Sequence, residues 1–204
     1  MSEVLVSYMR LTLALATLAL STVAFSQNPV TADSPFQIRY ATNLNIGDSV
    51  VNISNSGASG GTICANIYTF DPAEEMISCC TCSVTPNALQ SLSVIKSLIS
   101  NPLTPAIPSS VVIKILASSG TCNASVATPI VPGLVAWGTT LHLNTSTATP
   151  SYYGTETAFT PASLSAGEFT HITSTCGFIQ ADGSKFGICA GCAQGGLGGS
   201  VSVQ

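Results

Sequence analysis

The sequence has 204 residues, of which 7% are charged and 46% are hydrophobic, and its formal net charge is −4. Such sparse and mainly acidic charge excludes a nucleic-acid-binding protein, a polybasic membrane-surface module and a coiled coil. The high apolar content also excludes disorder driven by charge, so we expect a packed core.

The N-terminus has the pattern of a secretory signal peptide. Arg10 precedes the apolar run LTLALATLAL, and the small residues Ala24 and Ser26 allow cleavage after Ser26. The run is too short to span a bilayer, so no stable membrane span is expected after cleavage. We therefore predict a signal peptide over 1–26, a flexible segment over 27–35 and a single domain over 36–204, secreted to the extracellular space or the cell surface.

Alternating apolar and polar residues predict a mainly β domain. Phe36, Ile38 and Tyr40 alternate with Gln37 and Arg39, which is typical of a half-buried strand. Short strands with Ser, Thr, Gly and Pro turns, and no alternating helices, favour a β-sandwich of immunoglobulin-like or jelly-roll-like type. The predicted strands are 36–40, 51–53, 63–70, 111–117, 137–143, 152–159 and 201–203.

The strand over 137–143 has two distinct faces. Trp137, Leu141 and Leu143 share one face, which we expect to be buried. His142 falls on the other, polar face, where solvent exposure is expected.

Residues 86–100 are predicted as a short α-helix. Thr85 and Pro86 resemble an N-cap followed by proline at the first helical position. The apolar residues Leu89, Leu92, Ile95 and Ile99 then recur at helical spacing, and Asn101-Pro102 ends the run.

Residues 165–180 are predicted as a second helix, with a β-hairpin as the alternative for 165–189. Ser165 and Glu168 have the spacing of a capping box. In the alternative, the Asp-Gly pair after this segment is a hairpin turn that places Cys176 opposite Cys189. We favour the helix because the hairpin leaves unexplained both the capping box and the helical spacing of Phe169, Ile172, Cys176 and Ile179.

An even number of cysteines behind a secretion signal predicts disulfide bonds. Two Cys-x-x-Cys motifs, at 79–82 and 189–192, leave a structural zinc site or a thiol-redox site as alternatives. Cysteines as close as those at 79–82 do not pair easily with one another, so we expect pairing between the clusters 79–82 and 176–192, with Cys64–Cys122 as the fourth bond. The predicted disulfide cysteines are Cys64, Cys79, Cys80, Cys82, Cys122, Cys176, Cys189 and Cys192.

Asp71, Glu74 and Glu75 form the one acidic cluster of the sequence. We expect an exposed turn after a strand, with a calcium site or paired catalytic carboxylates as alternatives. A polysaccharide hydrolase would use carboxylates such as Glu74, Glu75, Glu156 or Glu168. No cofactor and no catalytic residue is predicted.

Three further motifs are interpreted as structural. Residues 57–61 match G-x-S-x-G, but a predicted strand follows where the nucleophile elbow needs a helix. Ser93 and Lys96 match S-x-x-K without its partner motifs. Two histidines, His142 and His171, do not form a zinc-protease motif.

The C-terminal residues contain one more alternating pair. Val201 and Val203 follow a glycine-rich stretch. They are predicted to add an edge strand to their own sheet, with self-association through this strand as the alternative.

Three stretches together resemble a family of small secreted bacterial proteins of uncharacterised activity. They are NLNIGDSVVNISNSG at 43–57, YTFDPAEEMISCCTC at 68–82 and CGFIQADGSKFGICAGC at 176–192. The resemblance covers nearly all of the mature chain and implies a bacterial, exported setting, with no activity, cofactor or catalytic residue to carry over.

The sequence favours a secreted, non-catalytic structural or binding module, because charge and histidine are sparse and the polar residues are mainly Ser, Thr and Asn. The alternatives are a carboxylate-dependent polysaccharide hydrolase and a metal-binding or thiol-redox module that uses the Cys-x-x-Cys pairs. The ligand and partner are not predicted.

Overall fold

The computed structural model describes residues 34–146, 149–190 and 192, which belong to the compact unit Ala32–Gln204. The predicted signal peptide, most of the predicted segment 27–35 and the predicted strand over 201–203 lie outside the described residues. No helix within the described part of the chain is long and apolar enough to cross a membrane.

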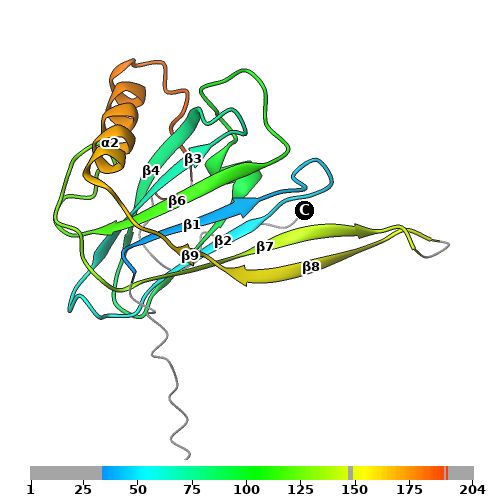
Figure 1. Cartoon of the computed structure of the whole chain (residues 1–204), viewed down its shortest axis with the longest axis horizontal. Coiled ribbons are helices and arrows are strands. Elements are labelled where there is room, and N and C mark those ends of the chain that lie inside the picture. The colour runs from blue at the N-terminus through cyan, green and yellow to red at the C-terminus, as the bar shows by residue number, and fades with distance from the viewer. Residues whose placement is uncertain (1–33, 147–148, 191, 193–204) are drawn as a thin grey trace, which may run out of the picture. The chain divides into compact units, whose positions relative to one another are not determined.

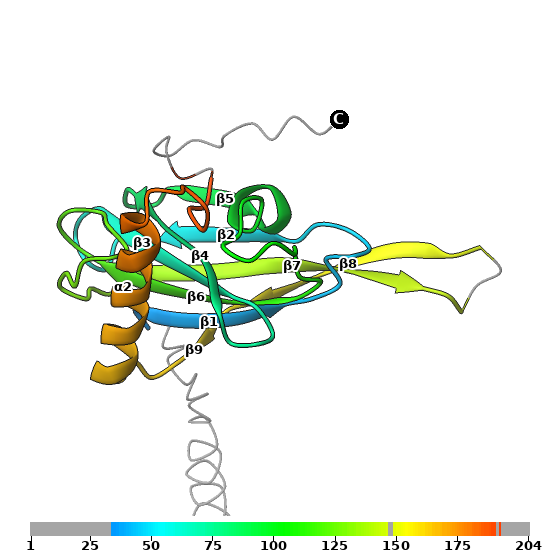
Figure 2. The same ribbon diagram turned by 90° about the horizontal axis from the view of Figure 1, so that it is seen from above.

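Two antiparallel sheets form the framework, which confirms the predicted mainly β, sandwich-like fold (Figures 1 and 2). The five-stranded sheet has the order β4-β3-β6-β1-β9 and the four-stranded sheet has the order β5-β2-β7-β8. The first sheet consists of β1 (Phe36–Ala41), β3 (Ile63–Phe70), β4 (Met76–Val84), β6 (Val111–Ser118) and β9 (Thr160–Pro161). The second consists of β2 (Val50–Asn55), β5 (Leu89–Ser93), β7 (Leu134–Asn144) and β8 (Ser151–Ala158).

The main core lies between the two sheets. Ile53 of β2 and Leu134 of β7 meet Ile67 of β3 and Ile113 of β6, and all four are fully buried. A second apolar cluster lies on the opposite face of the five-stranded sheet, where Tyr68 and Leu116 pack beneath a helix. All eight residues of β3 are buried because both faces of this sheet are covered there.

The predicted helix over 165–180 is confirmed as α2 (Ala166–Ala181). Ser165 is its N-cap, and the Ser165 hydroxyl accepts a hydrogen bond from the Glu168 amide at 3.1 Å. Ile172, Cys176 and Ile179 are buried against the sheet, as predicted from the intervals of three, four and three residues that separate them and Phe169 (the 3-4-3 spacing). The hairpin alternative for 165–189 is therefore wrong.

The predicted helix over 86–100 is wrong, because this segment contains strand β5 and the five-residue π-helix η2 (Val94–Leu98). Residues 85–88 form a β-turn in which the Ala88 amide donates to the Thr85 carbonyl at 3.0 Å and Asn87 has a φ of 60°. Proline is favoured at the second position of such a turn as well as at the first helical position, and here it serves the turn. β5 then completes the ladder of β2 along Val50–Ser54, so pairing across the sheet overrides the local helical pattern.

Strand β4 is not among the predicted strands, because its first five residues are all buried and the segment shows no alternation of apolar and polar residues. It forms a hairpin with β3 through the turn at 71–75, which contains Asp71, Glu74 and Glu75. Glu74 has a φ of 65° in this turn, and Asp71 to Glu75 are mostly exposed. The prediction of an exposed acidic turn is confirmed.

The burial of β1 and β7 differs in part from the prediction: Phe36 is buried as expected, but residues on the opposite face of β1 are buried as well. Gln37 and Arg39 are 5% and 7% exposed and face the four-stranded sheet, whereas Tyr40 is 59% exposed. On β7 the buried residues are Leu134, Ala136, Gly138 and Thr140, and Trp137 is half-buried. The small residues of β7 leave room for the long polar side chains of β1, so this part of the interface is polar.

Candidate functional site

All eight cysteines lie within the described residues and all are paired in disulfides. The predicted Cys64–Cys122 bond is present, with the two Cα atoms 5.1 Å apart. The predicted pairing between the two clusters is also confirmed, and the Cys176–Cys189 bond of the hairpin alternative is absent. The inter-cluster bonds are Cys79–Cys176, Cys80–Cys189 and Cys82–Cys192, with Cα separations of 5.8, 5.5 and 4.7 Å.

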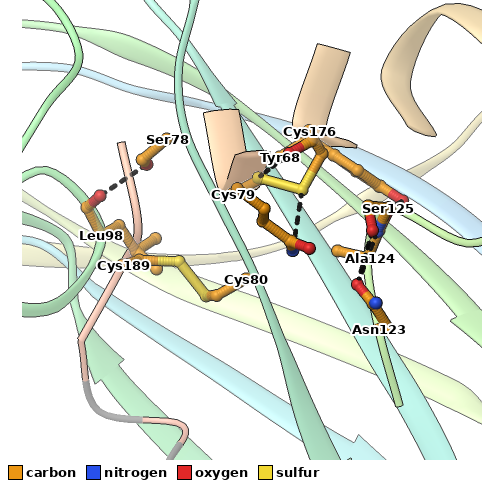
Figure 3. The surroundings of a disulfide bond; sticks show 11 residues. Tyr68, Ser78, Cys79, Cys80, Leu98, Asn123, Ala124, Ser125, Cys176 and Cys189 are labelled. Carbon is orange, nitrogen blue, oxygen red and sulfur yellow. Dashed lines mark hydrogen bonds between the residues drawn. A yellow bond between two sulfur atoms is a disulfide. The ribbon is translucent and has the colours of Figure 1, made fainter. Parts of the chain in front are cut away.

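The Cys79–Cys176 bond fixes α2 itself, and the bonds of Cys189 and Cys192 hold the segment after α2 beside β4. Figure 3 shows the Cys79–Cys176 and Cys80–Cys189 bonds leaving β4 in different directions. The Cys79 amide donates to the Gly187 carbonyl at 2.8 Å, and the Cys189 amide donates to the Cys79 carbonyl at 3.3 Å. This parallel bridge covers part of an edge that would otherwise present unpaired backbone groups.

Neither Cys-x-x-Cys motif is closed on itself. Cys79 and Cys82 bond to two different cysteines of the C-terminal cluster, Cys176 and Cys192. Likewise, Cys189 and Cys192 bond to two different cysteines of β4, Cys80 and Cys82. A thioredoxin-like site forms its disulfide within the motif, and a zinc site needs thiolates. In this oxidised form the motifs serve as structural cross-links.

One groove brings together several of the candidate site residues. It has a volume of about 330 Å³ and lies between the β3–β4 turn and the first turns of α2. Its polar lining consists of Asp71, Glu74, Lys114, Glu168 and His171. Sequence reasoning named the three carboxylates and His171 separately but did not single out Lys114, and only the packing of α2 over β3 and β6 places these residues together.

Lys114 is the electrostatic centre of this groove. Its Nζ lies 2.5 Å from Glu168 Oε1 and 4.2 Å from the centroid of the Phe70 ring. The two charged side chains are 23% and 32% exposed, so solvent partly screens the pair. Asp71 Oδ1 accepts hydrogen bonds from the amides of Ala73 and Glu75, so this oxygen stabilises the turn.

The other candidate carboxylates lie elsewhere. Glu75 is exposed beside the groove but does not line it, and Glu156 lies on β8 in the other sheet. The acidic cluster Asp71, Glu74 and Glu75 does not converge, since no group of three potential metal ligands is found among the described residues.

The remaining motif residues have structural partners. Ser93 is the N-cap of η2, where its hydroxyl accepts from the Lys96 amide at 2.7 Å and donates to Asp48 Oδ2. His142 is half-buried and not freely exposed. Its ring stacks on Tyr153 with centroids 5.1 Å apart, and its Nε2 lies 2.9 Å from Thr155 Oγ1.

The β7–β8 ribbon carries the longest fully exposed strand of the two sheets, β8. Figures 1 and 2 show its far end projecting beyond the other strands. All eight residues of β8 are exposed, including Tyr152 at 60% and Tyr153 at 52%. β8 is also the last strand of the four-stranded sheet, so its outer backbone groups face no other described strand.

Sequence reasoning did not identify Arg39 as a buried charged residue. The alternation of β1 placed it on the solvent side, whereas the structure buries it between the sheets. The available signal was its identity as the one arginine after the predicted signal peptide.

Comparison with known proteins gives no relative: no family model, no curated protein and no solved structure matches this chain.

Proposed function

We propose that the protein is an exported, non-catalytic module that binds or builds structure at the cell surface or outside the cell. The four disulfides support this setting, because such bonds persist in oxidising compartments. The predicted signal peptide and the resemblance to small secreted bacterial proteins support the same setting.

The observation that carries the binding role is the contrast between two sheet edges. The edge of β4 is partly covered by a segment fixed with two disulfides, whereas β8 is left exposed along its whole length. Exposed edge strands pair readily with other chains, and proteins usually protect them with charges, prolines or covering segments. β8 contains no proline and one charged residue, Glu156, so it is suited to accept another strand.

We propose that the strand added to β8 is β8 of a second copy. Antiparallel self-pairing about a two-fold axis at Gly154 places Glu156 opposite Tyr152 of the copy, so the two carboxylates do not face each other. This contact is distinct from the predicted self-association through residues 201–203, which lie outside the described residues.

The test is the molar mass of the purified protein as a function of concentration, measured by sedimentation equilibrium. We expect reversible dimers that Tyr152→Lys shifts towards monomers, because a lysine on an edge strand opposes pairing. Phe178→Lys is the matched control, since Phe178 is 69% exposed on α2 and lies outside the ribbon. A monomer at every concentration would overturn the self-pairing, and dimers that survive Tyr152→Lys would place the contact elsewhere.

One observation favours a second candidate, a polysaccharide hydrolase: Glu74 and Glu168 line the same groove. The purified protein should then release reducing ends from polysaccharides, and both Glu74→Gln and Glu168→Gln should abolish the release. Glu156→Gln, on the other sheet, is the control.

A further inference from the structure

Two of the four disulfides are neighbours on one face of β4. Cys80 and Cys82 are two positions apart in this strand, so their side chains point to the same face, towards the core between the sheets. Cys80 bonds to Cys189, and Cys82 bonds to Cys192. The Sγ atoms of Cys80 and Cys192 belong to different bonds but lie only 3.7 Å apart, which is contact distance.

The two cysteines of each bond differ in burial. Cys80 and Cys82 are 9% and 1% exposed, whereas Cys189 and Cys192 are half-buried. Thiol–disulfide exchange begins with the attack of a thiolate on an accessible disulfide sulfur. A thiolate from solvent therefore meets either bond at its C-terminal cysteine.

Attack at Cys192 leads to a new bond through the 3.7 Å contact. The thiolate of an external dithiol bonds to Cys192, the Cys82–Cys192 bond breaks, and Cys82 leaves as a thiolate. The second thiol of the dithiol then attacks this mixed disulfide and frees Cys192 as a thiolate. The Cys192 thiolate attacks Cys80, so that a Cys80–Cys192 bond forms and Cys189 leaves.

Attack at Cys189 ends in the same product. Here the Cys80–Cys189 bond breaks, and the Cys80 thiolate attacks Cys192 across the same contact, which forms Cys80–Cys192 and releases Cys82. The second thiol of the dithiol frees Cys189 from its mixed disulfide. By either route the dithiol loses two electrons and two protons and becomes a disulfide, and the protein gains thiols at Cys82 and Cys189.

Backbone hydrogen bonds hold the segment around Cys189 while its sulfur bonds change. The Cys189 amide donates to the Cys79 carbonyl at 3.3 Å, and the Ala190 amide donates to the Ser97 carbonyl at 2.7 Å. The Cys80–Cys192 bond also joins this segment to β4. Gain of two electrons therefore leaves the segment attached, with its sulfur atoms close enough to be oxidised again.

We propose that Cys80, Cys82, Cys189 and Cys192 form a two-electron thiol–disulfide exchange site whose substrate is a dithiol. The site differs from a thioredoxin-like one, because the bond that forms joins β4 to the C-terminal segment and does not close a Cys-x-x-Cys motif. Its reduced form presents Cys189 as a half-buried thiol that can form a mixed disulfide with a partner. The site is independent of the proposed self-pairing through β8.

The first test is partial reduction of the purified full chain with one equivalent of dithiothreitol. Acid stops the exchange, N-ethylmaleimide labels the free thiols in denaturant, and non-reducing mass spectrometry with fragmentation between the cysteines of β4 locates the bonds. We expect a Cys80–Cys192 bond together with label on Cys82 and Cys189. Absence of this bond would overturn the proposal, and so would a Cys189–Cys192 bond in its place.

The second test uses Cys82→Ala, which generates the attacking thiol without a reductant. It leaves Cys192 free beside the Cys80–Cys189 bond. Incubation with iodoacetamide at about pH 8, where a free thiol is partly ionised, should label Cys189 as well as Cys192. The Cys80–Cys192 bond should appear as Cys189 is labelled.

Cys176→Ala is the matched control. It leaves Cys79 free, which is adjacent to Cys80 in sequence but lies on the opposite face of β4, so Cys189 should stay unlabelled. Equal labelling of Cys189 in the two variants would contradict exchange through the Cys80–Cys192 contact. The partial reduction of the wild type needs no substitution and decides the proposal if a variant does not fold.

Discussion

Cys79 and Cys80 are adjacent in sequence but form their disulfides on opposite faces of β4. Cys79 belongs to the cluster beneath α2 and bonds to Cys176, whereas Cys80 belongs to the core between the sheets and bonds to Cys189. Successive side chains of a strand point to opposite faces, so the strand conformation of β4 decides which partner each cysteine meets. One strand thereby fixes both the helix and the C-terminal segment.

The Cys79–Cys176 bond is predicted to contribute strongly to stability, because it links residues 97 positions apart. The double variant Cys79→Ala/Cys176→Ala should lower the free energy of unfolding by about 2–5 kcal/mol, as measured by denaturant titration. Phe178→Ala, on the exposed face of the same helix, should change it by less than about 0.5 kcal/mol. Equal stability of the double variant and the wild type would show that packing alone holds α2.

Gly138→Ala is predicted to destabilise the sandwich. The new methyl group would lie 2.8 Å from both Arg39 Nη1 and the Val50 carbonyl oxygen, so the backbone or the guanidinium must shift. The expected loss is about 1–3 kcal/mol in thermal or denaturant unfolding. Gly154→Ala on β8 is the matched control, since a methyl group added there would meet nothing within 4 Å and no loss is expected. Similar effects of the two substitutions would contradict the close approach.

Ser165→Ala is predicted to weaken α2, because the Glu168 amide loses its acceptor. The expected cost is about 1 kcal/mol of unfolding free energy. Ser174→Ala, at an exposed position within the same helix, controls for the loss of a serine and should be neutral or slightly stabilising. If both variants lost the same amount, the capping role of Ser165 would be wrong.

Tyr68 is predicted to make stability fall at alkaline pH. Its hydroxyl donates to the Ala124 carbonyl at 2.7 Å, and burial raises the pKa of Tyr68 far above its ordinary value. An unfolded tyrosine ionises near pH 10 while folded Tyr68 stays protonated, so its contribution is complete below about pH 10 and decreases above it. Unfolding free energies measured between pH 7 and 11 should show this decrease.

Tyr68→Phe provides the check on that pH dependence. It should reduce the alkaline decrease and should cost about 1–2 kcal/mol at neutral pH, because the Ala124 carbonyl loses its donor. Tyr152→Phe, with a ring that is 60% exposed, should leave neutral-pH stability unchanged. An identical alkaline profile in Tyr68→Phe and the wild type would assign the decrease to other groups.

The sequence by itself determined those features that depend on local pattern. Alternation located most strands, because the period of two is a property of the extended backbone. The capping box and the 3-4-3 spacing located α2, because both lie within a single helix. The division of six cysteines into two compact clusters predicted the pairing between them, since neighbouring cysteines cannot easily bond to each other.

Only the tertiary structure decided which face of a strand is buried and which local pattern prevails. The helical pattern of 86–100 yielded to β5 because β2 offered a ladder of backbone partners. Arg39 entered the interior because Gly138 and Thr140 of β7 gave it space and an acceptor. The groove around Lys114 joins residues from three distant segments, and no pattern within any one of them specifies that they meet.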